Sequence, residues 1–191
     1  MKLQRILPFA KQLLEASVNE GDYVIDATIG NGHDTVFLAK LIGKSGHVYG
    51  YDIQEEAIAN TNERLKVECL EDRVTLFHQG HQHIFQTVPK EKHGEIAGAI
   101  FNLGYLPGGD KAVVTIAETT IEAIEQLLAI LKPEGLIVLV IYHGHKEGQI
   151  ERDKVMNYVQ TIDPSVAHVL KYQFINKNNH PPFIIAIEKR L

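Results

Sequence analysis

Short runs of β-branched and other apolar residues alternate with longer stretches in which apolar residues recur every three or four positions. The short runs predict buried strands and the longer stretches predict amphipathic helices, an alternation typical of βαβ units around a parallel sheet. Helices are predicted at residues 6–17, 35–41, 55–69, 115–131 and 149–160. Strands are predicted at residues 23–27, 47–52, 74–78, 96–102, 136–141, 167–174 and 183–188.

The last two predicted strands follow each other without an intervening helix, joined by residues 176–182, which include Pro181 and Pro182. Adjacent strands joined this way pair as an antiparallel hairpin. The fold class is therefore predicted to be α/β, a doubly wound seven-stranded sheet with one antiparallel edge strand. The sequence has no repeat, low-complexity tract or linker, so residues 1–191 are predicted to form a single domain.

Composition narrows the class of protein. The longest apolar stretches, such as residues 136–141, are far shorter than the roughly 20 residues that span a bilayer. The sequence turns polar at Lys11 and Gln12, before a signal-peptide core can form, which predicts a cytoplasmic location. Because the formal net charge is −5, any contact with RNA is expected to be local.

The ten histidines raise the question of a metal site, because His78, His81, His83 and His93 lie close together in the sequence. Their spacing matches no recognisable zinc interval, and the single cysteine has no second thiol beside it. No metal site is predicted.

A glycine-containing turn follows the first predicted strand, at residues 26–35. A phosphate-binding dinucleotide loop would need a third small residue where Thr35 stands, so this loop is a weak pyrophosphate site. It resembles instead the adenosylmethionine loop of methyltransferases, in which an acid at the strand end, here Asp26, orients the amino acid part of the cofactor. The glycine turn then passes the ribose and the sulfonium. Polar residues at the following helix start add further contacts.

A second acid, Asp52, closes the second strand, where a carboxylate can accept both ribose hydroxyls. Ile53 is predicted to cover the adenine face, and the resemblance to methyltransferases implies that Gly80 and His81 contact the adenine edge. The predicted adenosylmethionine-binding residues are Asp26, Thr28, Gly30, Asn31, Gly32, His33, Asp34, Asp52, Ile53, Gln54, Gly80, His81 and Asn102. The alternative is that these strand-end acids and turn glycines have structural roles only.

The end of the fourth strand is the expected place of methyl transfer. Residues 102–105, Asn-Leu-Gly-Tyr, resemble the [DNS]-P-P-[YFW] tetrapeptide of amino methyltransferases, with two prolines replaced. In that family the first side chain accepts hydrogen bonds from an amine and the aromatic ring stacks on a flat base. The resemblance gives these roles to Asn102 and Tyr105, provided that the loop keeps its shape without proline.

An alkylamine acceptor is mostly protonated at neutral pH, so a nearby base is useful. His143 and His145 are predicted to take that proton, with Tyr142 stacking beside them; the alternative is that they are solvated strand-end residues. The predicted catalytic residues are Asn102, Tyr105, Tyr142 and His143. The predicted substrate-binding residues are Tyr105, His145, His180 and Pro181.

Four segments together, at 26–35, 102–110, 142–145 and 179–182, resemble one small bacterial group of class I methyltransferases, the rRNA methylases or YtqB/MnmM group. The resemblance implies S-adenosyl-L-methionine as cofactor and the tRNA anticodon region as partner. It implies methylation of the aminomethyl group of wobble 5-aminomethyl-2-thiouridine to the methylaminomethyl form.

Three alternatives stay open: an rRNA methyltransferase, a small-molecule N- or O-methyltransferase, and a cofactor-binding scaffold without activity. Basic residues gathered around the pocket mouth would favour RNA, and two copies in a homodimer could form a wider basic surface. The basic residues in question are Lys2, Arg5, Lys11, Lys40, Lys44, Lys111, Lys146, Lys171 and Lys177.

Overall fold

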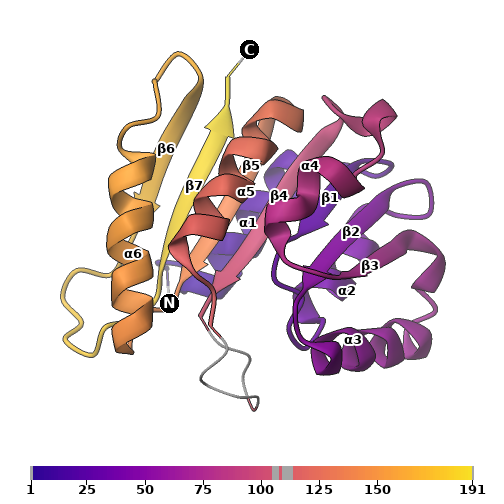
Figure 1. Ribbon diagram of the computed structural model, residues 1–191, viewed down its shortest axis with the longest axis horizontal. Helices are drawn as coiled ribbons and strands as arrows, with labels where there is room; N and C mark the ends of the chain where they lie inside the picture. Colours follow the sequence, from indigo (N-terminus) through magenta and orange to yellow (C-terminus); the bar gives the residue numbers. More distant parts are fainter. Residues whose placement is uncertain (1, 105–107, 109–113, 191) are drawn as a thin grey trace.

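The computed structural model describes residues 2–104, 108 and 114–190 (Figure 1). The strands are β1 (Tyr23–Asp26), β2 (His47–Asp52), β3 (Val74–His78), β4 (Ile96–Leu103), β5 (Leu131–Ile141), β6 (Ala167–Tyr172) and β7 (Phe183–Lys189). The α-helices are α1 (Ile6–Ser17), α2 (His33–Leu41), α3 (Glu55–Val67), α4 (Ile84–Thr87), α5 (Ala117–Ile130) and α6 (Lys146–Val159). Short 3₁₀ turns are η1 (Glu71–Arg73), η2 (His81–His83) and η3 (Lys90–Lys92).

The seven strands form one sheet in the order β3-β2-β1-β4-β5-β7-β6. The pairs among β1 to β5 are parallel, whereas β7 is antiparallel to both of its neighbours, β5 and β6. The predicted doubly wound seven-stranded sheet is confirmed. The reversed strand lies one position inside the edge, because the terminal hairpin inserts β7 between β5 and β6.

Helices cover both faces of the sheet (Figure 1). The apolar side of α1 packs with α2 and α3 over one face, through residues such as Leu14, Leu38 and Leu65. On the other face, α4, α5 and α6 pack over the alternate strand residues, which include Phe101 and Leu139. Successive side chains of a strand point to opposite faces, so the fully buried strands are apolar throughout.

Some element ends differ from the predicted ones. β5 begins at Leu131 rather than at residue 136, because Leu131 pairs with Ile96 ahead of a register shift. The turn signals in between lie within this irregular part of the strand, where Glu134 has φ 63°. α3 ends at Val67 rather than at Cys69, which adopts the left-handed φ of 54° that a helix interior does not allow.

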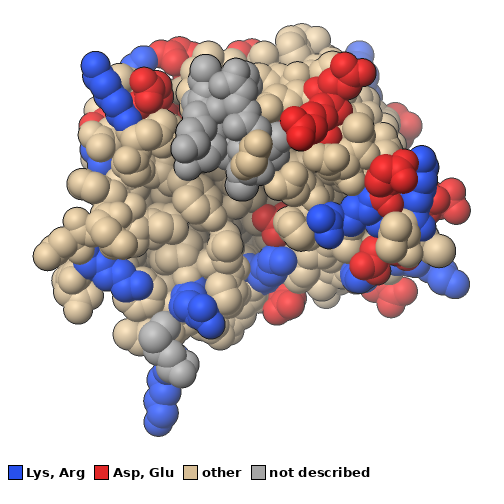
Figure 2. All heavy atoms as spheres, turned by 90° about the horizontal axis from the view of Figure 1, so that it is seen from below, with Lys and Arg blue, Asp and Glu red and all other residues tan. Residues whose placement is uncertain are grey.

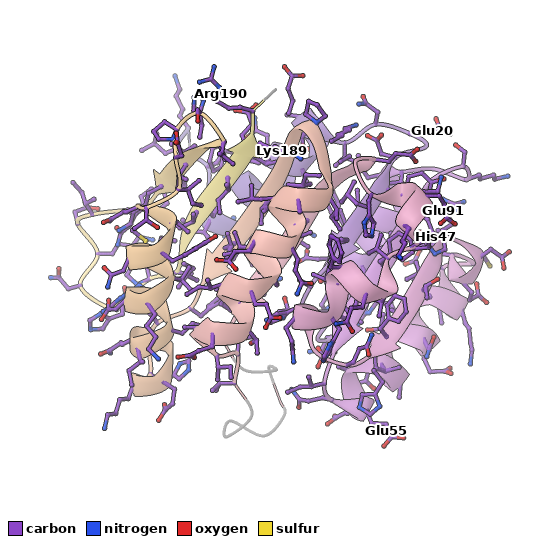
Figure 3. The ribbon with its side chains drawn as sticks, turned by 45° about the horizontal axis from the view of Figure 1, so that its top comes forward. Glu20, His47, Glu55, Glu91, Lys189 and Arg190 are labelled. Carbon is purple, nitrogen blue, oxygen red and sulfur yellow. The ribbon has the colours of Figure 1, made fainter. Side chains whose placement is uncertain are left out.

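The parallel strands end together at one edge of the sheet, the lower edge in Figure 1. Strand order reverses between β1 and β4, since the chain builds β2 and β3 on one side and β5 on the other. Ligands of such sheets bind in the crevice at this reversal, outside the carboxyl ends of the strands. Figure 3 shows Glu55, which follows β2, at the lower edge, and His47, which begins β2, toward the opposite edge. No helix in the described part of the chain is both long and apolar enough to cross a membrane.

Candidate active site

Two cavities open at the carboxyl edge of the sheet and share the walls formed by Thr28, Gly30, Asn102 and Gly104. The first has a volume of about 280 Å³ and lies over the ends of β1 and β2. The second, of about 880 Å³, lies between the start of α1, the loop after β1 and the end of β5. A ligand in one cavity can therefore meet a ligand in the other beside Asn102.

The predicted cofactor acid Asp26 lines neither cavity. Its side chain is fully buried, and its carboxylate accepts hydrogen bonds from Thr28 N at 3.3 Å and from Thr35 Oγ1 at 2.6 Å. Burial, together with the nearby Asp34 carboxylate, raises the pKa of Asp26 to about 7. Asp26 thus stabilises the loop from the buried side. A ligand in either cavity would not contact its carboxylate.

This buried carboxyl makes stability depend on pH. The pKa of Asp26 is about 7 in the folded chain against an ordinary value of 3.8, so its contribution to stability is fully present below pH 3.8 and is lost as the pH rises through about 7. Asp26→Asn removes this titration. We expect the unfolding free energy of the wild type, relative to Asp26→Asn, to fall by roughly 3 kcal/mol between pH 5 and pH 8. Urea unfolding at both pH values measures it, and a difference independent of pH would contradict the assignment.

Asp52, the acid predicted to bind the ribose, lines the first cavity. Its two carboxylate oxygens accept hydrogen bonds from Gly30 N at 2.9 Å and from Gln54 N at 3.0 Å. Each oxygen keeps a lone pair, so the carboxylate can still accept from hydroxyl groups in the cavity. Because Gly30 N binds Asp52 and Gly32 N binds the carbonyl of Ile29 at 2.9 Å, these loop amides are not free to surround a phosphate.

Other predicted cofactor residues line the same cavity: Thr28, Gly30, Ile53, Gln54, Gly80, His81 and Asn102. Ile53 is 57% exposed, an apolar side chain that a flat aromatic ring could cover. His81 donates from Nδ1 to the carbonyl of Ala27 at 3.0 Å, and burial lowers its pKa to about 4, which keeps the ring neutral. Sequence patterns missed the apolar wall residues Tyr51, Val114 and Ile116, which carry no motif.

The remaining residues of the predicted cofactor loop lie elsewhere. Asn31, His33 and Asp34 line the second cavity rather than the first. Gly32 lines neither cavity; it precedes α2 with φ 76°, and a Cβ there would lie 2.6 Å from Thr61 Oγ1. Glycine is thus required at position 32 by the turn and by the packing of α3.

Asn102, at the end of β4, lines both cavities. Its backbone N–H donates to Thr28 Oγ1 at 2.6 Å, and its side-chain Nδ2 donates to Asp34 Oδ2 at 2.9 Å. Lys11 Nζ lies 3.4 Å from the other Asp34 oxygen. A carboxylate only accepts hydrogen bonds, so the amide nitrogen must face Asp34 and the amide oxygen of Asn102 remains as an acceptor.

The predicted catalytic residues Tyr142 and His143 and the predicted substrate-binding residues His145 and His180 all line the second cavity. His143, however, donates from Nε2 to the carbonyl of Pro181 at 3.0 Å, and its Nδ1 accepts from Arg152 Nη1 at 3.2 Å. Burial and the Arg152 charge lower its pKa. The structure therefore places His143 as a neutral link to the terminal hairpin, with both nitrogens engaged, rather than as a base. Pro181, predicted to bind substrate, contributes its carbonyl as the acceptor of the His143 hydrogen bond. Tyr105 lies outside the described residues.

A buried acid supports the wall shared by the two cavities. Thr115 Oγ1 donates to Glu151 Oε2 at 2.6 Å, Thr120 Oγ1 donates to Oε1 at 2.9 Å, and Gly104 N donates to Thr115 Oγ1 at 2.9 Å. Burial raises the pKa of Glu151. Sequence reasoning missed Glu151. The signal was available, because Glu151 lies one helical turn before Val155 on the buried side of α6, where apolar residues are expected. Among the described residues, no group of three or more His, Cys, Asp or Glu side chains is placed to hold a metal ion.

Two crystal structures of bacterial proteins resemble this chain over nearly its whole length. One, described as a putative rRNA methylase from Clostridium thermocellum, is 41% identical with a TM-score of 0.95, and the match covers 99% of this chain and 100% of that one. The other, SMU.1697c from Streptococcus mutans, is described as a putative methyltransferase in complex with SAH. It is 37% identical with a TM-score of 0.88, and the match covers 98% of this chain and 99% of that one.

The name of a plant relative specifies a substrate. The chloroplastic tRNA (mnm(5)s(2)U34)-methyltransferase of Arabidopsis thaliana is 36% identical over 187 residues, which cover 92% of this chain and 66% of that protein. This chain therefore spans slightly less than two thirds of the plant protein's length. Residues 48–188 match the family described as "Putative rRNA methylase". The similarity in backbone structure to the C. thermocellum protein agrees with that match, and the chain belongs to this rRNA methylase family.

Proposed function

We propose that this chain is an S-adenosyl-L-methionine-dependent N-methyltransferase that methylates the aminomethyl group of wobble 5-aminomethyl-2-thiouridine in tRNA. The observation that carries the proposal is the position of Asn102. Its side chain lies where the two cavities meet, and its amide oxygen is left to accept a hydrogen bond from an amine.

The first cavity fits the cofactor. Asp52 can accept hydrogen bonds from the ribose hydroxyls and Ile53 can cover the adenine face, while the Asp52 carboxylate suits a cationic ligand better than a phosphate. SAH, the demethylated cofactor, is bound in the S. mutans relative, which supports this assignment. When bound, adenosylmethionine supplies an electrophilic methyl group on a positively charged sulfur.

The residues around Asn102 orient the acceptor amine. Asp34 fixes the amide so that its oxygen can hold the amine N–H while the nitrogen lone pair faces the first cavity. The negative charge of Asp34 also favours an ammonium group entering the second cavity. Since both nitrogens of His143 are engaged, the proton of an ammonium substrate leaves through another group or through water.

The substrate is supported by the plant relative, whose name specifies the wobble position of tRNA. Ribosomal RNA is the second candidate, because the family carries the rRNA methylase description and a ribosomal RNA small subunit methyltransferase H from Oenococcus oeni is 34% identical over half of this chain. The homodimer and the cytoplasmic location stay predictions.

Transfer of a labelled methyl group separates these substrates. Purified protein is incubated with methyl-labelled adenosylmethionine and with tRNA from cells lacking the modification, rRNA, or a metabolite extract. We expect label in tRNA, recovered as the methylaminomethyl nucleoside after digestion. Label only in rRNA or in metabolites would overturn the tRNA assignment and leave the cofactor assignment intact.

The role of Asp34 has its own test. In Asp34→Asn, an amide faces the Asn102 amide, so Asn102 can pair in either orientation and its oxygen is no longer fixed toward the acceptor. We expect kcat to fall about 10- to 100-fold, in keeping with a charged hydrogen bond, while the affinity for SAH changes little. Asp72→Asn, at an exposed position, is the control. An unchanged kcat would show that Asn102 is oriented by other contacts.

A further inference from the structure

The start of the chain and the terminal hairpin carry positive charge without carboxylates. The first acidic residue is Glu15, near the far end of α1, and no acidic residue lies between Asp163 and Glu188. Lys2, Arg5 and Lys177 are exposed, and within the described residues none of the three takes part in an ion pair. In a chain with a net charge of −5, this distribution is uneven.

The start of the chain and the terminal hairpin contact each other directly. The rings of Phe9 and Tyr172 lie 4.3 Å apart, and the Tyr172 hydroxyl donates to the carbonyl of Gln4 at 2.8 Å. Lys177 Nζ lies 5.0 Å from the ring of Phe174, which in turn contacts Tyr172. The cations of the two segments therefore lie on one surface, and these contacts fix the positions of the two segments relative to each other.

This surface adjoins the second cavity. Leu7, Pro8 and Lys11 of α1 line that cavity on one side, and His180 of the hairpin lines it too. Figure 2 shows this edge of the molecule, with Lys and Arg side chains spread over its lower left part and fewer Asp and Glu side chains among them. Exposed apolar side chains lie between the cations, with Leu3 66% and Ile175 91% exposed.

We propose that Lys2, Arg5 and Lys177, on the surface formed by the start of α1 and the β6–β7 hairpin, bind the phosphate backbone of the RNA substrate. Cations without acidic partners are attracted to phosphates, and exposed apolar side chains can pack against a base that has left its stack. The surface would hold an RNA stem while one nucleotide enters the second cavity. This inference rests on the proposed function, because it requires an RNA substrate.

The test removes the three charges together. Lys2→Gln, Arg5→Gln and Lys177→Gln are combined in one variant, and Lys11 is kept because it pairs with Asp34. We expect KM for unmodified tRNA to rise about tenfold or more, with kcat at saturating tRNA and the affinity for SAH unchanged. The dependence of tRNA binding on salt should weaken, with the slope of log K against log salt less steep by about 2 to 3 for three lost phosphate contacts.

A matched variant controls for net charge. Lys44, Lys66 and Lys90 precede β2, β3 and β4 and so lie toward the opposite edge of the sheet, the edge where His47 and Glu91 are labelled in Figure 3. Their triple replacement by glutamine makes the same change in charge and should leave KM and the salt slope as in the wild type. Equal effects of both triple variants, or none from the first, would overturn the proposal.

The wild-type reaction separates this inference from the proposed function. If the wild type methylates tRNA and the first triple variant does so with unchanged KM and salt slope, the RNA surface lies elsewhere and the proposed function stands. If the wild type neither binds nor methylates RNA, both fail. A loss of binding to anionic lipid vesicles or to an acidic protein, with tRNA binding unaffected, would assign the surface to another partner and contradict the inference.

Discussion

Replacement of Asn102 by alanine should lower kcat about 10²- to 10³-fold, the loss seen when one preorganised hydrogen-bonding group at a reacting centre is removed. The physical reason is geometric: the Asn102 amide oxygen is the acceptor left at the meeting point of the two cavities once Nδ2 is bound to Asp34. Single-turnover methyl transfer to unmodified tRNA measures the chemical step, and titration with SAH measures cofactor binding. Cofactor affinity should change by a few-fold at most.

Asn157→Ala is the control for Asn102, since Asn157 is an exposed asparagine on α6. It should leave both the transfer rate and the cofactor affinity unchanged. If Asn102→Ala instead weakened SAH binding strongly and left single-turnover transfer intact, Asn102 would be a cofactor residue rather than the group that orients the amine.

Loss of the Asp52 carboxylate should chiefly weaken cofactor binding rather than slow methyl transfer. In Asp52→Ala, the cavity loses its charged acceptor, and Gly30 N and Gln54 N lose their partners. Because hydrogen bonds to a charged group contribute about 1.5–3 kcal/mol each, the affinity for SAH should fall about 100-fold. Calorimetric titration with SAH measures this effect directly.

Asp72→Ala removes an exposed carboxylate of η1 and serves as the control for Asp52. Single-turnover transfer at saturating cofactor should be affected less by Asp52→Ala than by Asn102→Ala. Wild-type affinity for SAH in Asp52→Ala would show that the cofactor does not use this carboxylate.

The sequence was sufficient for the fold class because short apolar runs alternate with amphipathic stretches along the chain, which is the pattern of a parallel sheet covered by helices. β2 and β3 have their predicted bounds, and the reversal at β1 and β4 brings Asp52 and Asn102 to one edge. The place of β7 inside the edge was not predictable, since an apolar run does not say which neighbour it pairs with. The long run of β7, fully buried from Phe183 to Ile187, is consistent with that inner position.

The site was predicted in part. Motif order could not tell that Asp26 points beneath its loop while Asp34 reaches the second cavity, because that depends on the tight turn at Gly30 and Gly32. Nor could it tell that the two nitrogens of His143 are engaged, since the partners come from the hairpin and from Arg152 on α6.

A crystal structure with SAH and an anticodon stem-loop carrying 5-aminomethyl-2-thiouridine tests the central claim most directly. The account predicts SAH in the first cavity, with its ribose hydroxyls on Asp52, and the aminomethyl nitrogen about 3 Å from Asn102 Oδ1 in the second. An amine bound away from Asn102, or SAH bound outside the first cavity, would contradict it.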